Sequence, residues 1–527
     1  MGQIVPNLNF EGHLTSQTTQ QRMSGPDTWE LELLGEDSLW ANIPILSNFI
    51  SVQDSPPYEY VSSHDVPQPL MNPTLSGNGQ FVNGMAANGT GGMINQVPKQ
   101  HSSDQSTFLP ADEITLLRHF VDFAVPPILI GVEPRWNSSR DALLRLSKSN
   151  LPLRHAICAF SALSLEEAET RTSSARQSST FYSTLAMTEL NKLLDEQANG
   201  NARSDSQESI LASIFFLSYV ELIVSNAPKR SVYLLDRAHA LLSNRSSSAS
   251  PLYNQLQIWL KLLDAKVVSA GGKGIHLHTN PDTQDLDIVR ESYDSSVICE
   301  QSGVTTPILE TEEILFNSLN RPSYNFYVQV LNFSGRIARL DKWHRSRGSV
   351  QDELEVMLAA DKVIRDLNAL WTRRPAIIDL ADQREQLRQY LAPSLATKVE
   401  HHLRTYTANY YACFIHLQRV AYAHLKPISQ IKTSVAKIVH LSRLTVDEGH
   451  ALPVSMLWPL MMAACEAEDE ETQNWIINCI EGMKSKVGNA MRTAKLVREI
   501  VKRQKSGQRA DARTVMHEAF GAVFAII

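Results

Sequence analysis

Cysteine thiolates commonly hold structural zinc ions, and this chain has five cysteines. Zinc sites usually pair thiolates about two to four residues apart, whereas the closest two cysteines here, Cys465 and Cys479, are fourteen positions apart. An odd number of scattered cysteines also gives no disulfide framework. The sequence therefore predicts reduced thiols in an intracellular protein, at Cys158, Cys299, Cys413, Cys465 and Cys479.

Two pairs of histidines are candidates for metal binding. His276 and His278 could present two imidazoles on one side of an extended segment. A zinc site needs about three or four converging ligands, and nothing in this Gly- and Pro-marked stretch holds such ligands together, so we expect a solvated loop. His401 and His402 begin a predicted helix, where adjacent side chains point to different faces. We therefore predict no metal site.

The sequence carries no motif for nucleotide binding or catalysis. The segment 271–274, GGKG, lacks the preceding strand and the following Ser or Thr of a phosphate-binding loop. It predicts instead a helix end in which glycine adopts a positive φ. The acidic residues of 466–471 indicate a solvated face, because a catalytic pair needs burial in a pocket. We predict no catalytic residue, no cofactor and no enzyme activity, and keep an enzyme of an unrecognised helical class as an alternative.

Basic residues gather near the end of the chain, and Lys502, Arg503 and Lys505 form the densest group. Such a cluster is typical of a nuclear-import segment and could also contact phosphates. The alternative is an amphipathic helix with a basic outer face, whose last turn complements the negative end of the helix dipole. The sequence leaves both interpretations open.

Residues 1–110 are rich in Asn, Gln, Ser, Gly and Pro, with no Lys or Arg between Arg22 and Lys99. Few apolar residues are present to offset the entropy lost on ordering, so we predict disorder. Within this region, 27–40 alternates acidic with apolar residues, a pattern typical of activation segments that fold on a partner. The alternative is a helix that packs against the folded part of the chain. The candidate contact residues are Trp29, Leu31, Leu33, Leu34, Leu39 and Trp40.

From residue 111 onward, apolar residues recur at helical spacing, which predicts an all-α fold. A polar stretch at 271–310 indicates a long surface loop. It divides a first helical half, 111–270, from a second, 311–527. Beyond a helix capped by Asp112, the predicted helices cover about 151–168, 175–196, 208–225, 229–243, 251–270, 322–342, 351–371, 397–424, 428–446, 455–483 and 487–504.

Composition excludes several classes of protein. The chain is 43% hydrophobic, enough for a large core, and its net charge is −7. A protein that coats nucleic acid by itself usually leaves a basic footprint. No secretory signal is present, and no run approaches the roughly 18 apolar residues that span a bilayer. We therefore expect a soluble protein without a membrane segment.

Several segments, in their order and spacing, resemble the fungal-specific transcription factor domain that follows binuclear Zn(II)2Cys6 clusters. The resemblance covers roughly 110–510, and its last part includes the step Trp458-Pro459. It implies an all-α regulatory domain in a nuclear regulator of transcription, often of metabolic or secondary-metabolite genes. The segments that carry it are 116–130, 151–169, 210–223, 232–242, 256–274, 405–420 and 455–471.

The zinc cluster of that family is not matched, because the first cysteine is Cys158. Direct, zinc-dependent DNA binding is therefore not carried over. We expect either a gene model that lacks an N-terminal exon or a protein that works through a DNA-binding partner and the transcription machinery. The alternative from another class is a helical scaffold or inhibitory partner with no direct DNA contact.

Large helical domains can leave apolar clefts between helices, so a small-molecule effector is a further expected partner. A homodimer is also compatible with the sequence. The apolar stripes Trp259/Leu263 and Trp458/Met461/Met462 are interpreted as core rather than as the wall of such a cleft.

Overall fold

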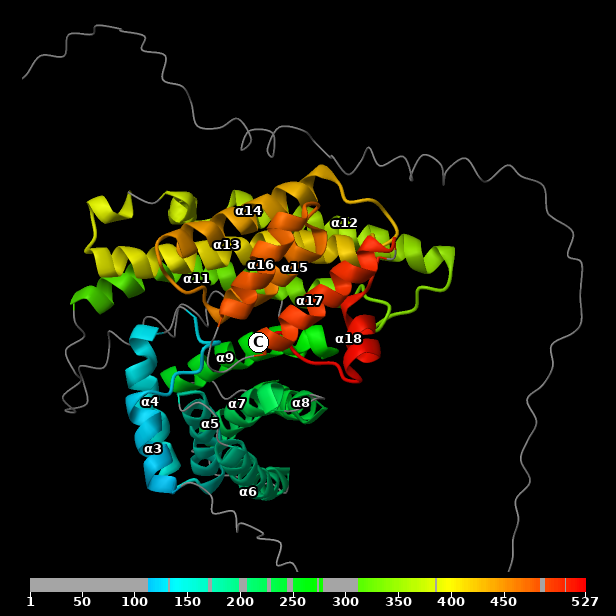
Figure 1. Ribbon diagram of the computed structural model, residues 1–527. Coiled ribbons are helices and arrows are strands. Elements are labelled where there is room, and N and C mark those ends of the chain that lie inside the picture. The colour runs from blue at the N-terminus through cyan, green and yellow to red at the C-terminus, as the bar shows by residue number, and fades with distance from the viewer. Residues whose placement is uncertain are drawn as a thin grey trace, which may run out of the picture. The chain divides into compact units, whose positions relative to one another are not determined.

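The described residues of the computed structural model form helices and turns, without strands, so the prediction of an all-α fold is confirmed (Figure 1). The predicted activation segment at 27–40, the rest of 1–110 and residues 278–310 lie outside the described part of the chain. The structure describes residues 112–130, 133–168, 173–198, 206–224, 229–243, 250–272, 274–277, 311–383, 386–483, 489–507 and 509–527.

Seven α-helices make up the described part of the first half, and α5 and α7 are packed against each other at its centre. Asp112 caps the first of them as predicted, because its carboxylate accepts a hydrogen bond from the Thr115 amide at 3.1 Å. The helices are α3 (Glu113–Asp122), α4 (Glu133–Ser147), α5 (Leu151–Ala168), α6 (Ser173–Ala198), α7 (Ser206–Val224), α8 (Lys229–Ser243) and α9 (Pro251–Val267).

Aromatic side chains from five helices meet in the core of this half. Phe120 of α3 lies 5.7 Å from Trp136 of α4 and 6.3 Å from Phe160 of α5, measured between ring centroids. Phe215 of α7 lies 5.2 Å from Trp259 of α9. Edge-to-face and tilted contacts of this kind add to the stabilisation from apolar burial. They fix α9 against α7 as the predicted apolar stripe requires.

Helix α7 corrects one prediction from the sequence. Its window Gln207–Val224 is long and apolar enough to cross a membrane. However, 72% of that window is buried, and α5, α6, α8 and α9 pack around it. A helix that is apolar on every face is equally typical of the core of a large helical protein. The packing of four helices around α7 shows that it is a core helix of this kind.

The predicted helix end at 271–274 is confirmed at Gly271. After α9 the chain makes a 3-10 turn, η2 (Val268–Ala270), and Gly271 then adopts φ 95°. The amide of Gly272 donates to the carbonyl of Val267 at 2.9 Å, which satisfies a terminal carbonyl of the helix. Glycine adopts this left-handed conformation without a steric penalty.

The prediction that His276 lies in a solvated loop is wrong. It belongs to the 3-10 turn η3 (Ile275–Leu277) and is buried. Its amide donates to Asp264 Oδ2 at 2.7 Å, and its Nε2 lies 3.0 Å from the carbonyl oxygen of Leu235. These two contacts tie the end of the first half down onto α8 and α9. The predicted polar loop from residue 278 onward is outside the described residues.

Eight α-helices make up the described second half, and α13 lies at its centre, packed against α11, α14 and α15 (Figure 1). Because both long faces of α13 are covered, most of its side chains are buried. The helices are α11 (Thr311–Ala338), α12 (Val350–Thr372), α13 (Pro393–Ala421), α14 (Ser429–Asp447), α15 (Leu457–Glu466), α16 (Glu470–Gly482), α17 (Ala490–Lys505) and α18 (Ala512–Phe520).

Two helix predictions in the second half need correction, and two helices, one in each half, were not predicted. The predicted helix 455–483 is two helices, because Asp469 caps α16 by accepting from the Thr472 amide at 2.6 Å. Helix α11 begins well before 322, and Pro322 lies inside it. Helices α4 and α18 were missed.

The two halves approach closely where α11 crosses the end of α9. Gly335 of α11 faces Leu277 of η3, and a Cβ added at Gly335 would lie 2.8 Å from the Leu277 Cβ. Only glycine therefore admits this approach without a shift of the neighbouring chain. This junction also forms one side of a cavity.

Candidate functional site

A cavity of about 220 Å³ lies where the two halves and the C-terminal segment meet. Its wall includes residues of α9, α11, α13 and α15, the segment from Arg509 and the start of α18. No single segment of the sequence supplies all of the residues that line this cavity. Ligand sites in proteins are usually concave, largely apolar and furnished with a few polar groups. The cavity has this character on a small scale.

Part of the cavity wall is apolar. Leu331 of α11, Met461 and Met462 of α15, and Met516 of α18 contribute to it. Unbranched methionine side chains adapt their shape to what they contact. Met461 and Met462 are buried, as the interpretation of this stripe as core predicted, but together with Trp458 they also line the cavity, so that interpretation is only partly right. Trp259 and Leu263, in contrast, are core residues.

Lys266 of α9 is the most buried ammonium on the cavity wall. Lys266 is 7% exposed, and burial lowers the pKa of its side chain to about 8. Transfer of an ammonium from water into a protein interior disfavours its charged form. An anion placed nearby would favour the charged form again.

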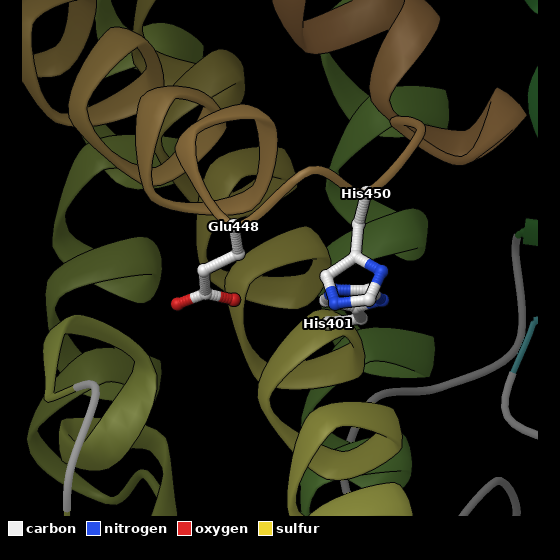
Figure 2. Close-up of side chains that lie close together, drawn as sticks. All are labelled: His401, Glu448 and His450. Atoms are coloured by element: carbon white, nitrogen blue, oxygen red, sulfur yellow. The ribbon is translucent and has the colours of Figure 1, made fainter.

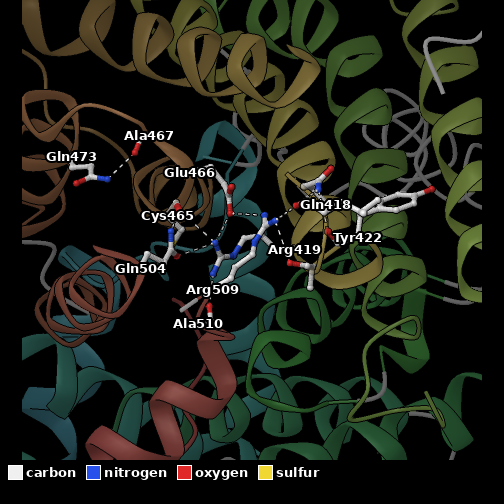
Figure 3. A network of polar contacts seen from close by, with 12 residues as sticks. Gln418, Arg419, Tyr422, Cys465, Glu466, Ala467, Gln473, Gln504, Arg509 and Ala510 are labelled. Carbon is white, nitrogen blue, oxygen red and sulfur yellow. Dashed lines mark hydrogen bonds and ion pairs between the residues drawn. The ribbon is translucent and has the colours of Figure 1, made fainter. Parts of the chain in front are cut away.

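A second group of charges centres on Glu466, at the end of α15 (Figure 3). Its Oε1 accepts hydrogen bonds from Arg419 of α13 and, at 2.9 Å, from Arg509. Arg419 also donates to the carbonyl of Ala510 at 2.6 Å. Glu466 is buried, so the prediction that it belongs to a solvated acidic face is wrong. The neighbouring Glu468 is exposed as predicted.

A third group lies at the start of α18, where Asp511 caps the helix. It accepts hydrogen bonds from the Thr514 amide at 3.0 Å and from the Trp343 indole at 3.2 Å. Burial opposes ionisation of Asp511, but these hydrogen bonds outweigh it and lower its pKa. Lys342 lies 3.8 Å from the same carboxylate.

Arg513 completes this wall. Its guanidinium lies 4.9 Å from the centroid of the Trp343 ring, a cation–π contact. A Cβ added at Gly271 would lie only 1.9 Å from Arg513 Nη2. The glycine that ends α9 therefore also makes room for this guanidinium. The Nε of Arg513 is buried without a hydrogen-bond partner.

Histidines on the cavity wall are held neutral by their surroundings. Burial lowers the pKa of His416 to about 4, with Arg419 adding to the effect. Burial, followed by the charge of Arg513, also lowers the pKa of His344. Neither imidazole therefore adds a positive charge near neutral pH.

A separate cluster could hold a metal ion by distance alone. The ligand atoms of His401, Glu448 and His450 lie within 4.8 Å of one another (Figure 2). However, both Glu448 oxygens accept from Arg404, at 2.8 and 2.9 Å. A bidentate guanidinium is a strong partner for a carboxylate and would compete with a cation. Burial, with His450 nearby, lowers the pKa of His401 to about 4. The arrangement therefore favours a structural ion pair between Arg404 and Glu448 over a metal site.

The four described cysteines are free thiols on separate helices, as the sequence predicted. Burial raises the pKa of Cys158 to about 12 and that of both Cys465 and Cys479 to about 11. Burial also raises the pKa of Cys413. Thiols with raised pKa values are poor nucleophiles and poor metal ligands. Cys299 lies outside the described residues.

The predicted import residues Lys502, Arg503 and Lys505 lie near the C-terminal end of α17. The opposite face of the helix is buried, so the amphipathic helix of the alternative interpretation is observed. Arg503 Nε lies 2.9 Å from Glu499, and Lys505 Nζ lies 3.1 Å from Glu470. Lys502 is exposed. Nuclear import through these residues stays a prediction.

Comparison with known families places most of the described part of the chain in one group. The family described as "Fungal specific transcription factor domain" matches residues 115–521. This range runs from within α3 to just past the end of α18 and includes every residue that lines the cavity except Ile526. No curated protein and no solved structure matches the chain. The chain belongs to the fungal-specific transcription factor domain family and is, by that membership, a regulator of transcription.

Proposed function

We propose that this protein acts in the nucleus on metabolic or secondary-metabolite genes, reaches promoters through a DNA-binding partner, and responds to a small effector. The observation that carries the proposal is the family match over residues 115–521. The cavity inside the matched region supports the effector, because both halves of the fold contribute to its wall.

Indirect promoter contact is supported by the charges and thiols of the described residues. Direct recognition of DNA relies on cations that reach phosphates and base edges. On α17, the most basic helix in the described part, Arg503 and Lys505 already pair with glutamates. The described cysteines lie apart on separate helices and are poor zinc ligands. A partner protein would supply the DNA contact.

The position of the cavity supports control by an effector. Its wall joins α9 of the first half to α11, α13 and α15 of the second. A ligand bound there would contact both halves at once. Such a ligand shifts a conformational equilibrium when it binds one arrangement of the halves more tightly than another.

The experiment is to tether the full chain to a heterologous DNA-binding domain and to measure a reporter gene that carries its site. We expect reporter output to differ from that of the DNA-binding domain alone. If 27–40 is an activation segment, Trp29→Ala with Trp40→Ala weakens an activating signal. Phe81→Ala, an aromatic change elsewhere in 1–110, is the matched control and leaves the signal unchanged.

Reporter output equal to that of the DNA-binding domain alone would contradict the proposal. It would favour the alternative of a scaffold or inhibitory partner without a role at promoters. Loss of signal in the Phe81→Ala control as well would show that 27–40 has no special part in activation.

A further inference from the structure

We infer that the exposed face of α17 is a docking surface for the acidic segment 27–40 of the same chain. The face consists of Met491, Lys495, Arg498 and Lys502. The inference goes beyond the proposed function and does not depend on whether 27–40 activates transcription. It rests on the charges of α17, on the composition of 27–40 and on the length of chain between the two.

Helix α17 carries a large excess of positive charge. Its sequence, AMRTAKLVREIVKRQK, contains six basic residues and one acidic residue, Glu499. Met491, Lys495, Arg498 and Lys502 follow one another at intervals of three or four positions, so they lie on one face of the helix. All four are exposed, whereas the opposite face is buried where α15, α16 and α18 pack against α17.

The acidic residue within α17 does not neutralise this face. Glu499 lies one helical turn from both Lys495 and Lys502, and the charge of Lys502 reaches it. However, its Oε1 accepts a hydrogen bond from Arg503 at 2.9 Å. Within the described part of the chain, Lys495 and Lys502 form no ion pair. Both ammonium groups are therefore open to an acidic ligand.

A cation of the first half lies near the start of the same face. Burial, followed by the charge of Arg176, lowers the pKa of Arg492. Arg176 belongs to α6 and is exposed, and Arg492 directly follows Met491. Two like charges near each other gain when an opposite charge approaches both of them.

The segment 27–40 has the complementary charge. It contains no Lys, Arg or His, and its leucines and tryptophans alternate with carboxylates. Met491, which is 55% exposed, offers these apolar side chains a contact beside the lysines. Complementary charge of this kind selects the partner and fixes its register. The acidic residues are Asp27, Glu30, Glu32, Glu36 and Asp37.

A phosphate backbone fits the same face less well. Double-stranded DNA carries one negative charge per about 1.7 Å of its axis. Glu481 pairs with Arg498, and Glu499 lies within the helix, so carboxylates stand among the cations. A continuous anion would approach these carboxylates, and like charges at an interface disfavour binding. A peptide with separated carboxylates can place them at the two lysines alone.

The chain between the segment and the folded part is long enough for docking. Residues 41–111 separate 27–40 from Asp112, the cap of α3. For a flexible chain of about 70 residues, as the composition predicts, the r.m.s. end-to-end distance is roughly 45 Å. Such a tether gives an effective concentration on the order of millimolar. Weak ion pairs can therefore hold the segment within one chain.

Docking would control access to the segment. Another protein that binds 27–40 would find it only in the undocked fraction of the chains. Its apparent affinity is lowered in proportion to that fraction. The α17 face would thus set a threshold for any partner of 27–40.

The test is zero-length crosslinking of the full-length protein with a carbodiimide, followed by mass spectrometry. The reagent activates a carboxylate, and a lysine amine in contact with it then forms an amide bond. We expect links from the acidic residues of 27–40 to Lys495 and Lys502. Lys362, an exposed lysine of α12, is the control and should form no such link above background. A mixture of 15N-labelled and unlabelled protein should show these links within single chains.

The decisive variant is Lys495→Glu with Lys502→Glu, two changes at exposed positions. The readout is cleavage by a glutamate-specific protease after Glu36, divided by cleavage after Glu59 in the same molecule. Because the protease acts on the open population, this ratio should rise at least about threefold in the variant. The matched control, Lys362→Glu, should leave the ratio unchanged.

A salt series on the unaltered protein keeps the inference testable even if the double variant does not fold. Added NaCl, up to about 0.5 M, screens exposed charges. The cleavage ratio should therefore rise with salt toward the value of the double variant.

The inference would be overturned by a cleavage ratio that is unchanged in the folded double variant, or by links no more frequent at Lys495 and Lys502 than at Lys362. Links found only between labelled and unlabelled chains would assign the face to a second copy. Binding of duplex DNA that is lost in the double variant, with an unchanged cleavage ratio, would assign it to phosphates.

Discussion

Arg509 donates to Glu466 at 2.9 Å and thereby ties the segment that follows α17 to the end of α15. Arg419 of α13 shares the same carboxylate oxygen. Both arginines line the cavity, so this contact orders part of its wall. The integrity of the cavity therefore depends on a buried carboxylate.

Glu466→Gln should destabilise the fold strongly. It removes the counter-charge of Arg419, whose side chain is 7% exposed. Loss of one partner of a buried ion pair typically reduces the free energy of unfolding by about 3–5 kcal/mol. The measurement is denaturant unfolding of the variant beside the unaltered protein.

The matched control for Glu466→Gln is Glu470→Gln. Glu470 pairs with Lys505 but is 70% exposed, and exposed pairs contribute roughly 0–1 kcal/mol. Equal losses of unfolding free energy in the two variants would show that the buried ion pair stabilises the fold no more than an exposed one.

Gly335→Ala should disturb the junction of the two halves. The added methyl group would lie 2.8 Å from the Leu277 Cβ, and overpacking of this kind typically lowers the free energy of unfolding by about 1–3 kcal/mol. Gly482→Ala on α16 meets no atom within 4 Å and should be neutral or stabilising by up to about 1 kcal/mol. Differential scanning calorimetry of both variants checks this, and an unchanged Tm in Gly335→Ala would refute the close approach.

Three buried histidines should make stability fall on acidification from about pH 6.5 toward pH 4, against an opposite contribution from Asp264, whose pKa burial raises to about 7. Burial lowers the pKa of His276, His401 and His416 to about 4, below the ordinary value of about 6.5. Between these values the unfolded chain binds more protons than the folded one, so acid favours unfolding. The contribution of the histidines is fully present above about pH 6.5 and is lost as the pH falls.

His401→Gln isolates one part of this pH dependence. It should flatten the slope of unfolding free energy against pH by up to about 1.4 kcal/mol per pH unit. His517 is exposed, so His517→Gln serves as the surface control for His401→Gln. Urea titrations between pH 5 and pH 7 give both slopes, and an unaltered slope in His401→Gln would contradict its burial as a neutral ring.

The import prediction can be tested by replacing Lys502, Arg503 and Lys505 together with alanine in a fluorescently tagged chain. If these residues are read by an import receptor, the nuclear fraction of the fluorescence should fall. Lys495→Ala with Arg498→Ala alters the same helix outside that group and should leave the nuclear fraction intact. An equal nuclear fraction in all three proteins would assign the basic face to folding alone.

Helix content was predictable because apolar stripes depend only on local sequence. The apolar stripe that contains Trp259 and Leu263 predicted α9 with nearly correct bounds. The break between α15 and α16 was missed because apolar residues continue on both sides of it, and the capping carboxylate of Asp469 looked like one member of an acidic run.

The cavity could not be predicted, because its walls come from segments far apart in the chain. Glu466 reads as solvated in the sequence, yet its partners Arg419 and Arg509 lie 47 and 43 positions away. His276 reads as part of a loop, yet its contacts come from α8 and α9. Tertiary packing decides whether these polar groups are buried, and the local sequence pattern carries no information about that packing.

The central claim is that the chain regulates transcription at promoters, and its most direct test is chromatin immunoprecipitation of the tagged full-length protein in its native host. We predict enrichment at a limited set of promoters whose transcripts change when the gene is deleted. Occupancy no greater than that of an untagged strain, with transcripts unchanged on deletion, would contradict the account.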